Sequence, residues 1–273
     1  ANYPTNTFTS LYVYDQSFSV IGTVNNNILY TNNGGKNWYS FLYYNNNDVS
    51  YFRTTSSICV IKSGSNYIIF TSVLYTSQYL YSYNSSTNNY VQTSTQNNKY
   101  NNYYISSYSI PVSSIANTNG PIQLSLIPPN ESNYIINIYD SDAGNNYIYF
   151  AGSSIIELNI SDTSKYAPYI IADPLYANTY YNCIKVYDDS NVIAVGYNVI
   201  SWTNTGTNKN DSGSIAPIWY NTKLPNISSF NLRSVYIYDL SYAVAAGDNG
   251  LFIYSTNWSS GTWNVAVSYT HLR

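Results

Sequence analysis

A pattern of strand, acidic turn, strand and glycine recurs along the chain, and it limits the fold more than any other feature. The two clearest copies are SLYVYDQSFSVIGTVNNNILYTNNGGKNW (10–38) and SVYIYDLSYAVAAGDNGLFIYSTNWSSGTW (234–263). Between them lie INIYDSDAGNNYIYFAGSSIIELNIS (136–161) and IKVYDDSNVIAVGYNVISWTNTG (184–206), and SICVIKSGSNYIIFTS (57–72) is a fainter copy. Alternating apolar residues within each copy indicate short strands with one or both faces buried.

The glycines that mark these copies give the period. Their successive spacings are 42, 88, 44 and 51 residues, and they are Gly22, Gly64, Gly152, Gly196 and Gly247. The double spacing predicts a degenerate copy at 103–126, which makes six repeats of about 44 residues. A period of 40 to 50 residues with three or four strands is typical of a β-propeller. We therefore expect an all-β fold, a β-propeller of about six blades. A seven-bladed ring cut short and an open arrangement are the alternatives.

The ends of the chain differ from the repeats. Residues 1–9 are expected to form a lead-in strand, and 10–266 to form the propeller. The terminal VSYTHLR (267–273) resembles a translated sequencing-library adapter, which would make His271 and Arg273 non-native. The chain contains no methionine and no recognisable signal peptide, so we expect that it begins after processing or is a fragment.

Composition excludes several classes of partner. Only 8% of the residues are charged, against about 25% in ordinary domains. The net charge of −3 argues against nucleic-acid binding, which needs a basic surface. No apolar run reaches the length of a membrane span. The 35 tyrosines and the scarcity of charge resemble secreted surface glycoproteins of thermoacidophilic archaea. Few ionisable groups would make stability depend only weakly on pH.

Export is also suggested by asparagines in glycosylation sequons. The possible N-glycosylation sites are Asn84, Asn130, Asn159, Asn210, Asn226 and Asn257. The two cysteines, Cys59 and Cys183, show no metal-ligand spacing, and we expect two buried thiols rather than a disulfide.

Two segments, TNNGGKNW (31–38) and STNWSSGTW (255–263), resemble the Asp-box of sialidase-like propellers. The matching residues are Thr31, Asn33, Gly35 and Trp38 in the first copy, and Ser255, Asn257, Gly261 and Trp263 in the second, where two extra residues precede the glycine. The second segment also resembles the blade pattern of the photosystem II assembly factor family. The resemblance implies that each box closes a hairpin between outer strands, so these residues are expected to be structural.

Sialidase activity does not follow from the resemblance. Sialidases bind a carboxylate with three arginines, and only Arg53 and Arg233 occur outside the suspect tail. Histidine for a nucleophilic triad, a phosphate loop and zinc-ligand spacing are also missing from the sequence outside that tail. We therefore predict no catalytic residues, no cofactor and no metal.

An aspartate follows the first strand in four of the copies: Asp15, Asp140, Asp188 and Asp239. An acid that recurs once per repeat is best explained as a turn former between the first and second strands. The alternative is an acidic rim at one end of the ring that could hold a cation.

Taken together, these features favour a non-enzymatic, exported propeller, located extracellularly or on a cell surface as a structural, adhesive or filament component. Its partners would be other surface proteins or further copies of itself. A glycan- or protein-binding recognition module is the first alternative, and a glycan-active enzyme the second.

Overall fold

The computed structural model describes residues 7–24, 27–42, 52–84, 89–111, 122–127, 137–160, 168–172, 179–205, 218–222, 224 and 227–266. These residues form strands and turns, with two short 3-10 helices, η1 (Asp248–Gly250) and η2 (Trp258–Ser260). Within these ranges, neither helix is long or apolar enough to cross a membrane. Residues 1–6 of the expected lead-in strand and the tail 267–273 lie outside the described residues.

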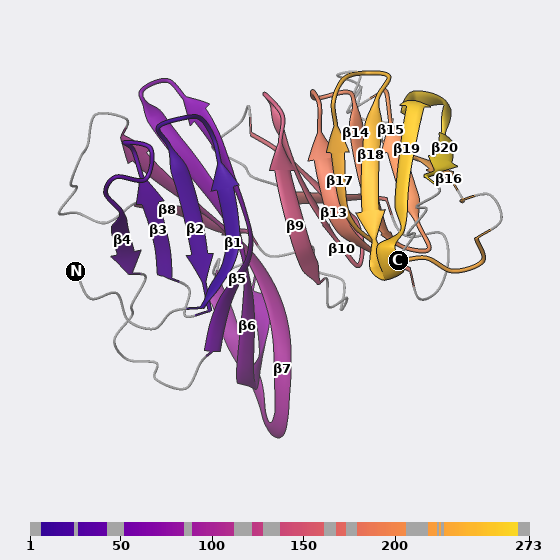
Figure 1. The fold of residues 1–273 in the computed structure, drawn as a ribbon. Helices are drawn as coiled ribbons and strands as arrows, with labels where there is room; N and C mark the ends of the chain where they lie inside the picture. Colours follow the sequence, from indigo (N-terminus) through magenta and orange to yellow (C-terminus); the bar gives the residue numbers. More distant parts are fainter. Residues whose placement is uncertain are drawn as a thin grey trace, which may run out of the picture. The chain divides into compact units, whose positions relative to one another are not determined.

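Five antiparallel sheets of four strands each contain all the named strands, in chain order (Figure 1). The chain divides into two compact units, residues 1–138 and residues 139–273. Sheets 1 and 2 belong to the first unit and sheets 3, 4 and 5 to the second. Every sheet is a meander in which consecutive strands are hydrogen-bonded neighbours.

The first unit contains eight named strands. Sheet 1 consists of β1 (Phe8–Val13), β2 (Ser19–Thr23), β3 (Asn27–Thr31) and β4 (Tyr39–Leu42), and sheet 2 of β5 (Phe52–Ser63), β6 (Asn66–Asn84), β7 (Asn89–Pro111) and β8 (Ile122–Ile127).

The second unit contains twelve named strands. Sheet 3 consists of β9 (Ile138–Ala143), β10 (Tyr147–Gly152), β11 (Ile155–Asn159) and β12 (Pro168–Ala172). Sheet 4 consists of β13 (Tyr180–Val186), β14 (Val192–Tyr197), β15 (Ile200–Thr203) and β16 (Tyr220–Thr222), and sheet 5 of β17 (Leu232–Ile237), β18 (Ala243–Gly247), β19 (Phe252–Asn257) and β20 (Thr262–Val265).

The sixth repeat expected at 103–126 is not a separate sheet, so that prediction was wrong. Its residues contribute to β7 and β8, the third and fourth strands of sheet 2. The double spacing arises because β6 and β7 are 19 and 23 residues long and pair along most of their length. Five sheets are therefore seen in the described part of the chain.

Sheet 4 shows how the apolar alternation is used. Every residue of β14 from Val192 to Gly196 is buried, although successive side chains point to opposite faces. Val192 and Ala194 pack with Tyr149 of sheet 3, whereas Ile193 and Val195 pack with sheet 5. Sheet 4 is thus covered on both faces, which explains why its strand reads as a continuous apolar run.

The repeated glycine at the end of the second strand has a steric cause. In sheets 1, 4 and 5 the first strand contains a bulge opposite this glycine. A Cβ at Gly196 would lie 1.8 Å from the Tyr180 carbonyl oxygen, and one at Gly247 would lie 2.3 Å from the carbonyl oxygen of Asn231. Gly64 does not share this place, because it lies in the turn between β5 and β6 with φ 57°.

Replacing Gly196 with alanine should therefore destabilise the second unit. We expect Gly196→Ala to lower the free energy of unfolding by about 2 kcal/mol or more, because the methyl group must displace backbone rather than a side chain. Thr256→Ala, at an exposed strand position, should change it by less than about 0.5 kcal/mol. Urea denaturation followed by circular dichroism measures both, and equal stability of the two variants would contradict this explanation of the repeat.

Candidate functional site

Three of the four repeated aspartates form the turn between the first and second strands, as the sequence predicts. Asp15 Oδ1 accepts hydrogen bonds from the amides of Ser17 (2.7 Å) and Phe18 (2.8 Å). The carboxylates of Asp188 and Asp239 bind the amides two and three residues onward in the same way. The Ser17 hydroxyl and both amides hold the pKa of Asp15 below its usual range, despite opposing desolvation.

Asp140 does not form such a turn, so the prediction was wrong for this residue. It lies inside β9, and its carboxylate accepts a hydrogen bond from the Ile184 amide on β13 (3.0 Å). Asp142 binds the Val186 amide of β13 at the same distance. Lys185 lies between them, with Nζ 3.7 Å from Asp140 Oδ2 and 3.9 Å from Asp142 Oδ2. Two carboxylates of sheet 3 therefore attach to the first strand of sheet 4.

Burial has the largest effect on the pKa of Asp142. Desolvation raises the pKa of its carboxyl above the usual range, although Lys185 and the amides of Val186 and Ala143 act in the opposite direction. Because both carboxylate oxygens accept backbone hydrogen bonds, the geometry fits a structural clip between two sheets.

The turn of sheet 3 is completed by an acid from sheet 4. Asp189 Oδ1 accepts a hydrogen bond from the Asn146 amide (3.0 Å), and its Oδ2 accepts one from the Asn146 side-chain nitrogen (2.8 Å). A Cβ at Gly144 would lie 2.2 Å from Asp189 Oδ1, so the approach of this carboxylate requires glycine. The sequence alone does not reveal this contact, because Asp189 lies 43 residues from Asn146.

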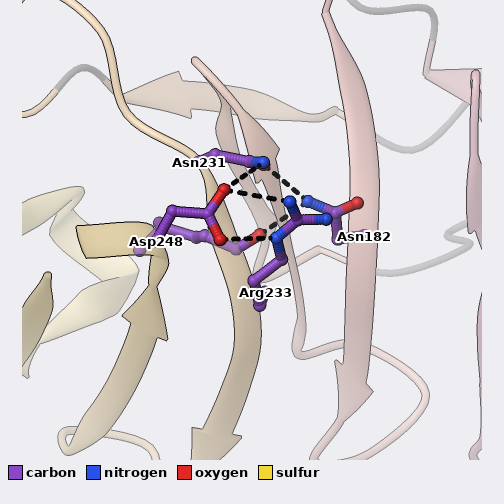
Figure 2. Close-up of polar contacts among 5 residues, drawn as sticks. Asn182, Asn231, Arg233 and Asp248 are labelled. Atoms are coloured by element: carbon purple, nitrogen blue, oxygen red, sulfur yellow. Dashed lines mark hydrogen bonds and ion pairs between the residues drawn. The ribbon is translucent and has the colours of Figure 1, made fainter. Parts of the chain in front are cut away.

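Sheets 4 and 5 are joined by a second polar cluster (Figure 2). The Asn182 side chain donates to Asn231 Oδ1 (2.7 Å) and to the Leu232 carbonyl (2.8 Å). Asn231 in turn donates to Asp248 Oδ2 (2.8 Å). Arg233 forms a two-point ion pair with Asp248, with donor–acceptor distances of 2.8 and 2.9 Å, and this pair holds the pKa of Asp248 below its usual range.

A hollow of about 480 Å³ adjoins this cluster. Asn231 and Asp248 line it together with apolar residues, among them Phe230, Leu251 and Phe252. This volume lies within the range of small-ligand sites, which combine an apolar lining with a few polar groups. The hollow could therefore receive a side chain or a sugar ring of a partner.

The turn that contains TNNGG is closed by side chains. The Thr31 hydroxyl donates to Asn33 Oδ1 (3.0 Å) and accepts from the Gly35 amide (2.9 Å). Asn33 Oδ1 also accepts from the Asn37 amide (2.9 Å). Gly35 has φ 86°, and a Cβ there would lie 3.8 Å from the Trp38 indole nitrogen. These four residues of the first segment thus lie together in one hairpin.

The second segment forms a related hairpin between β19 and β20. The Ser255 hydroxyl donates to the Thr262 carbonyl and accepts from the Asn257 amide. Gly261 has φ 75° and Trp263 is buried. Asn257 Oδ1 accepts from the Ser259 hydroxyl (3.1 Å), whereas the Asn33 side chain binds a backbone amide.

Trp258, which sequence reasoning did not single out, is fully buried in this second hairpin. Its indole N–H donates to the Asp239 carbonyl (3.0 Å), so the hairpin and the acidic turn of sheet 5 are joined through one side chain. Because that contact joins two turns of the same sheet, the spacing of the segment alone could not reveal it.

Sheet 5 also exposes an apolar face, here called the aromatic face. Tyr236 lies opposite Val244, which lies opposite Tyr254, and all three side chains are exposed, Tyr236 to 60%. Exposed Phe252 lies on the next row, and the flanking turn adds Tyr238 and Tyr242. Tyrosines at every second position were visible in the sequence, but their exposure was not.

The other predicted residues are distributed as follows. Asn257 is exposed at the end of β19, Asn159 is half-buried at the end of β11, and Asn84 ends β6. Asn130, Asn210 and Asn226 lie outside the described residues. Cys59 and Cys183 are buried thiols, and burial raises the pKa of Cys183 to about 12. In the described segments, no group of three or more His, Cys, Asp or Glu side chains could hold a metal ion.

Comparison with solved structures identifies the architecture. The WD40 β-propeller domain of Doa1 aligns with 96% of this chain and 68% of its own, with a TM-score of 0.53 and 9% sequence identity. The chain folds as a β-propeller. Two structures of YCF48 are also similar. YCF48 from Cyanidioschyzon merolae has a TM-score of 0.45 and 11% sequence identity, and the alignment covers 96% of this chain and 85% of that one. YCF48 bound to D1 peptide has a TM-score of 0.40 and 14% sequence identity, and the alignment covers 98% of this chain and 84% of that one. No protein-family model and no curated protein matches the sequence.

The raised pKa of Asp142 predicts a characteristic pH dependence. A carboxyl with a higher pKa in the folded chain binds more protons there, so its contribution to stability is largest at low pH and falls as pH rises through the folded pKa. The free energy of unfolding of the wild type, relative to Asp142→Asn, should therefore decrease as pH rises above about 4, the ordinary pKa of an aspartate carboxyl. Urea denaturation at a series of pH values measures the difference.

Asp248→Asn provides a control of opposite sign. Because Arg233 lowers the pKa of Asp248, this carboxylate stabilises the fold above its unfolded pKa and loses that effect as pH falls through the folded one. The wild type should thus gain stability relative to Asp248→Asn as pH rises. If the stability difference between the wild type and Asp142→Asn did not vary with pH, the pKa of Asp142 would not be raised by folding.

Proposed function

We propose that this propeller is a non-enzymatic protein that acts through protein contacts, as an exported structural or adhesive surface component. The aromatic face of sheet 5 is the observation that supports this most directly. Exposed apolar groups clustered on one surface are unusual in a soluble monomer and commonly mark interaction sites. Four tyrosines on or beside this face combine a large apolar ring with a hydroxyl that can remain hydrated.

The character of the surrounding surface favours the same function. Tyr236, Tyr238, Tyr242 and Val244 line a shallow hollow of about 460 Å³. No charged residue occupies the paired rows of this face, so a partner could cover it without desolvating a charge. Aromatic enrichment with charge depletion is typical of the centre of a protein interface.

The acids of the second unit support a structural role rather than catalysis. Asp140 and Asp142 accept backbone amides of the adjacent sheet and contact Lys185, and Asp189 accepts the amide of Asn146. We likewise propose that the TNNGG and STNWSSG hairpins are Asp-box-like turns. Their side-chain hydrogen bonds and left-handed glycines support that interpretation.

A recognition module for glycans or peptides is the second candidate. The hollow beside Asn231 and Asp248 favours it, because amide and carboxylate groups lie next to Phe230 and Phe252 there. Such a site would hold a sugar or side chain by stacking together with hydrogen bonds. It differs from the first candidate in the residues used, since only Phe252 belongs to both surfaces.

Adhesion through the aromatic face can be measured directly. Beads coated with the full chain should adhere to protein-coated surfaces, and the variant Tyr236→Ser/Tyr254→Ser should lose about 90% or more of that adhesion, since it removes central aromatic anchors. Tyr139→Ser/Tyr187→Ser, which alters one exposed tyrosine on β9 and one in the turn after β13, is the matched control and should adhere normally.

Different results would support different functions. Undiminished adhesion of Tyr236→Ser/Tyr254→Ser would contradict a role for the aromatic face. Binding to a glycan array that survives this variant and is lost in Asn231→Ala would favour the recognition module instead.

Export as a glycoprotein makes a further prediction about Asn257. Its side chain is exposed and accepts the Ser259 hydroxyl of its own sequon, so it is accessible in the folded chain. Expression in a secreting, glycosylating host should add glycan mass that Asn257→Gln removes, as intact-mass spectrometry would show. Asn159→Gln, at a half-buried strand position, should change that mass less. An unmodified chain after secretion would argue against the glycoprotein assignment.

A further inference from the structure

Three Asn-Gly pairs occur in the chain: Asn33–Gly34, Asn119–Gly120 and Asn249–Gly250. Asparagine is a thermolabile residue, because its side chain can lose ammonia. A following glycine favours this loss, since it has no Cβ to shield the amide nitrogen that attacks the side-chain carbonyl. Residues 119 and 120 lie outside the described residues, so the structure distinguishes the other two pairs.

The Asn33–Gly34 pair is held at both of its reacting groups. Asn33 Oδ1 accepts hydrogen bonds from the Thr31 hydroxyl (3.0 Å) and the Asn37 amide (2.9 Å). The Gly34 amide nitrogen, which would have to attack, donates to the Ser17 carbonyl (2.9 Å). Reaction at this pair therefore requires that the hairpin first break these bonds.

The turn that contains Asn249–Gly250 is held by the residue before the pair. The Asp248 amide donates to the Asn231 carbonyl (2.9 Å), and the Asp248 carbonyl accepts from the Leu251 amide (3.1 Å). In the described part of the chain, no hydrogen bond fixes the Asn249 carboxamide. A Cβ at Gly250 would meet no heavy atom within 4 Å, so the turn has room to change its conformation.

The backbone of Asn249 is also easier to move than that of a regular strand. Asn249 has φ 57° and ψ 27°, in the left-handed region that residues other than glycine rarely adopt. For the Gly250 nitrogen to reach the side chain, Asn249 must rotate about ψ. That rotation takes the residue out of a strained conformation, so the fold opposes it only weakly.

We propose that Asn249 is a site of spontaneous deamidation, whereas Asn33 is protected by its hairpin. The Gly250 nitrogen forms a bond to Asn249 Cγ while the bond from Cγ to the side-chain nitrogen breaks. Ammonia leaves with the proton of the Gly250 amide. Water then opens the cyclic imide at either of its carbonyl carbons and gives aspartate or isoaspartate, so water is the only co-reactant.

The product adds a carboxylate beside the cluster that joins sheets 4 and 5 (Figure 2). Arg233, which pairs with Asp248, would then face two neighbouring acids, and like charges raise each other's pKa. Asn249 and Asp248 both line the hollow of about 480 Å³, which would become more negative. Deamidation is therefore a one-way change in the charge of this surface as the protein ages, and it does not depend on the proposed function.

Incubation of the full chain in heavy-oxygen water at mildly alkaline pH, followed by peptide mapping with tandem mass spectrometry, tests the proposal. Opening of the imide incorporates an oxygen atom from that water, which identifies deamidation that occurred during the incubation. In the folded chain Asn33 should react at least about tenfold more slowly than Asn249, equivalent to about 1.4 kcal/mol, because its hydrogen bonds must break first. In urea, where both turns are lost, the two should react at similar rates.

Two variants identify the product on ion exchange. The acidic form that accumulates in the wild type should be lost in Asn249→Ser, and Asn249→Asp should elute with its aspartate component. Circular dichroism checks that each incubated sample remains folded.

Two results would overturn the proposal. If Asn249 stayed intact in the folded chain while it reacted in urea, its turn would be protective. If Asn33 and Asn249 reacted equally in the folded chain, the hydrogen bonds of the first hairpin would give no protection. Neither result affects adhesion through the aromatic face, which Tyr236→Ser/Tyr254→Ser tests separately.

Discussion

A four-stranded sheet is too narrow to bury its own hydrophobic side chains, so each sheet of this chain depends on the sheet beside it. Sheet 4 shows the requirement fulfilled, with both faces of β14 buried. The polar contacts are arranged around the same interfaces. Asp140 and Asp142 fasten sheet 3 to sheet 4, and Asn182 fastens sheet 4 to sheet 5. Because charged residues are scarce in the rest of the chain, we infer that apolar packing between the faces of neighbouring sheets is the main source of stability.

The parts of the fold that were predictable depend on short-range physics. The aspartate turns at Asp15, Asp188 and Asp239 involve amides two and three residues away, so the local sequence determines them. The glycine of the second strand was also visible as a repeat, although its reason, a bulged neighbour, appeared only in the structure. The all-β propeller class followed from the period itself.

The parts that were not predictable depend on neighbours distant in sequence. Asp140 carries the same Tyr-Asp signature as the true turns, yet β9 continues through it because its carboxylate finds the Ile184 amide, 44 residues onward. Gly64 matched the period by number while lying in a different turn. The exposure of Tyr236 could not be inferred either, because alternation alone does not say whether a face has a neighbour.

The bond between Asp189 and the turn of sheet 3 has a consequence for how the chain is made. Asn146 acquires its carboxylate partner from a residue 43 positions later, whereas sheets 1, 4 and 5 complete the same turn with their own aspartate. During synthesis from the N-terminus, the first hairpin of sheet 3 therefore emerges before the group that fixes its turn. We therefore expect this turn to become fixed only when the start of sheet 4 has been made, and sheets 3 and 4 to fold together.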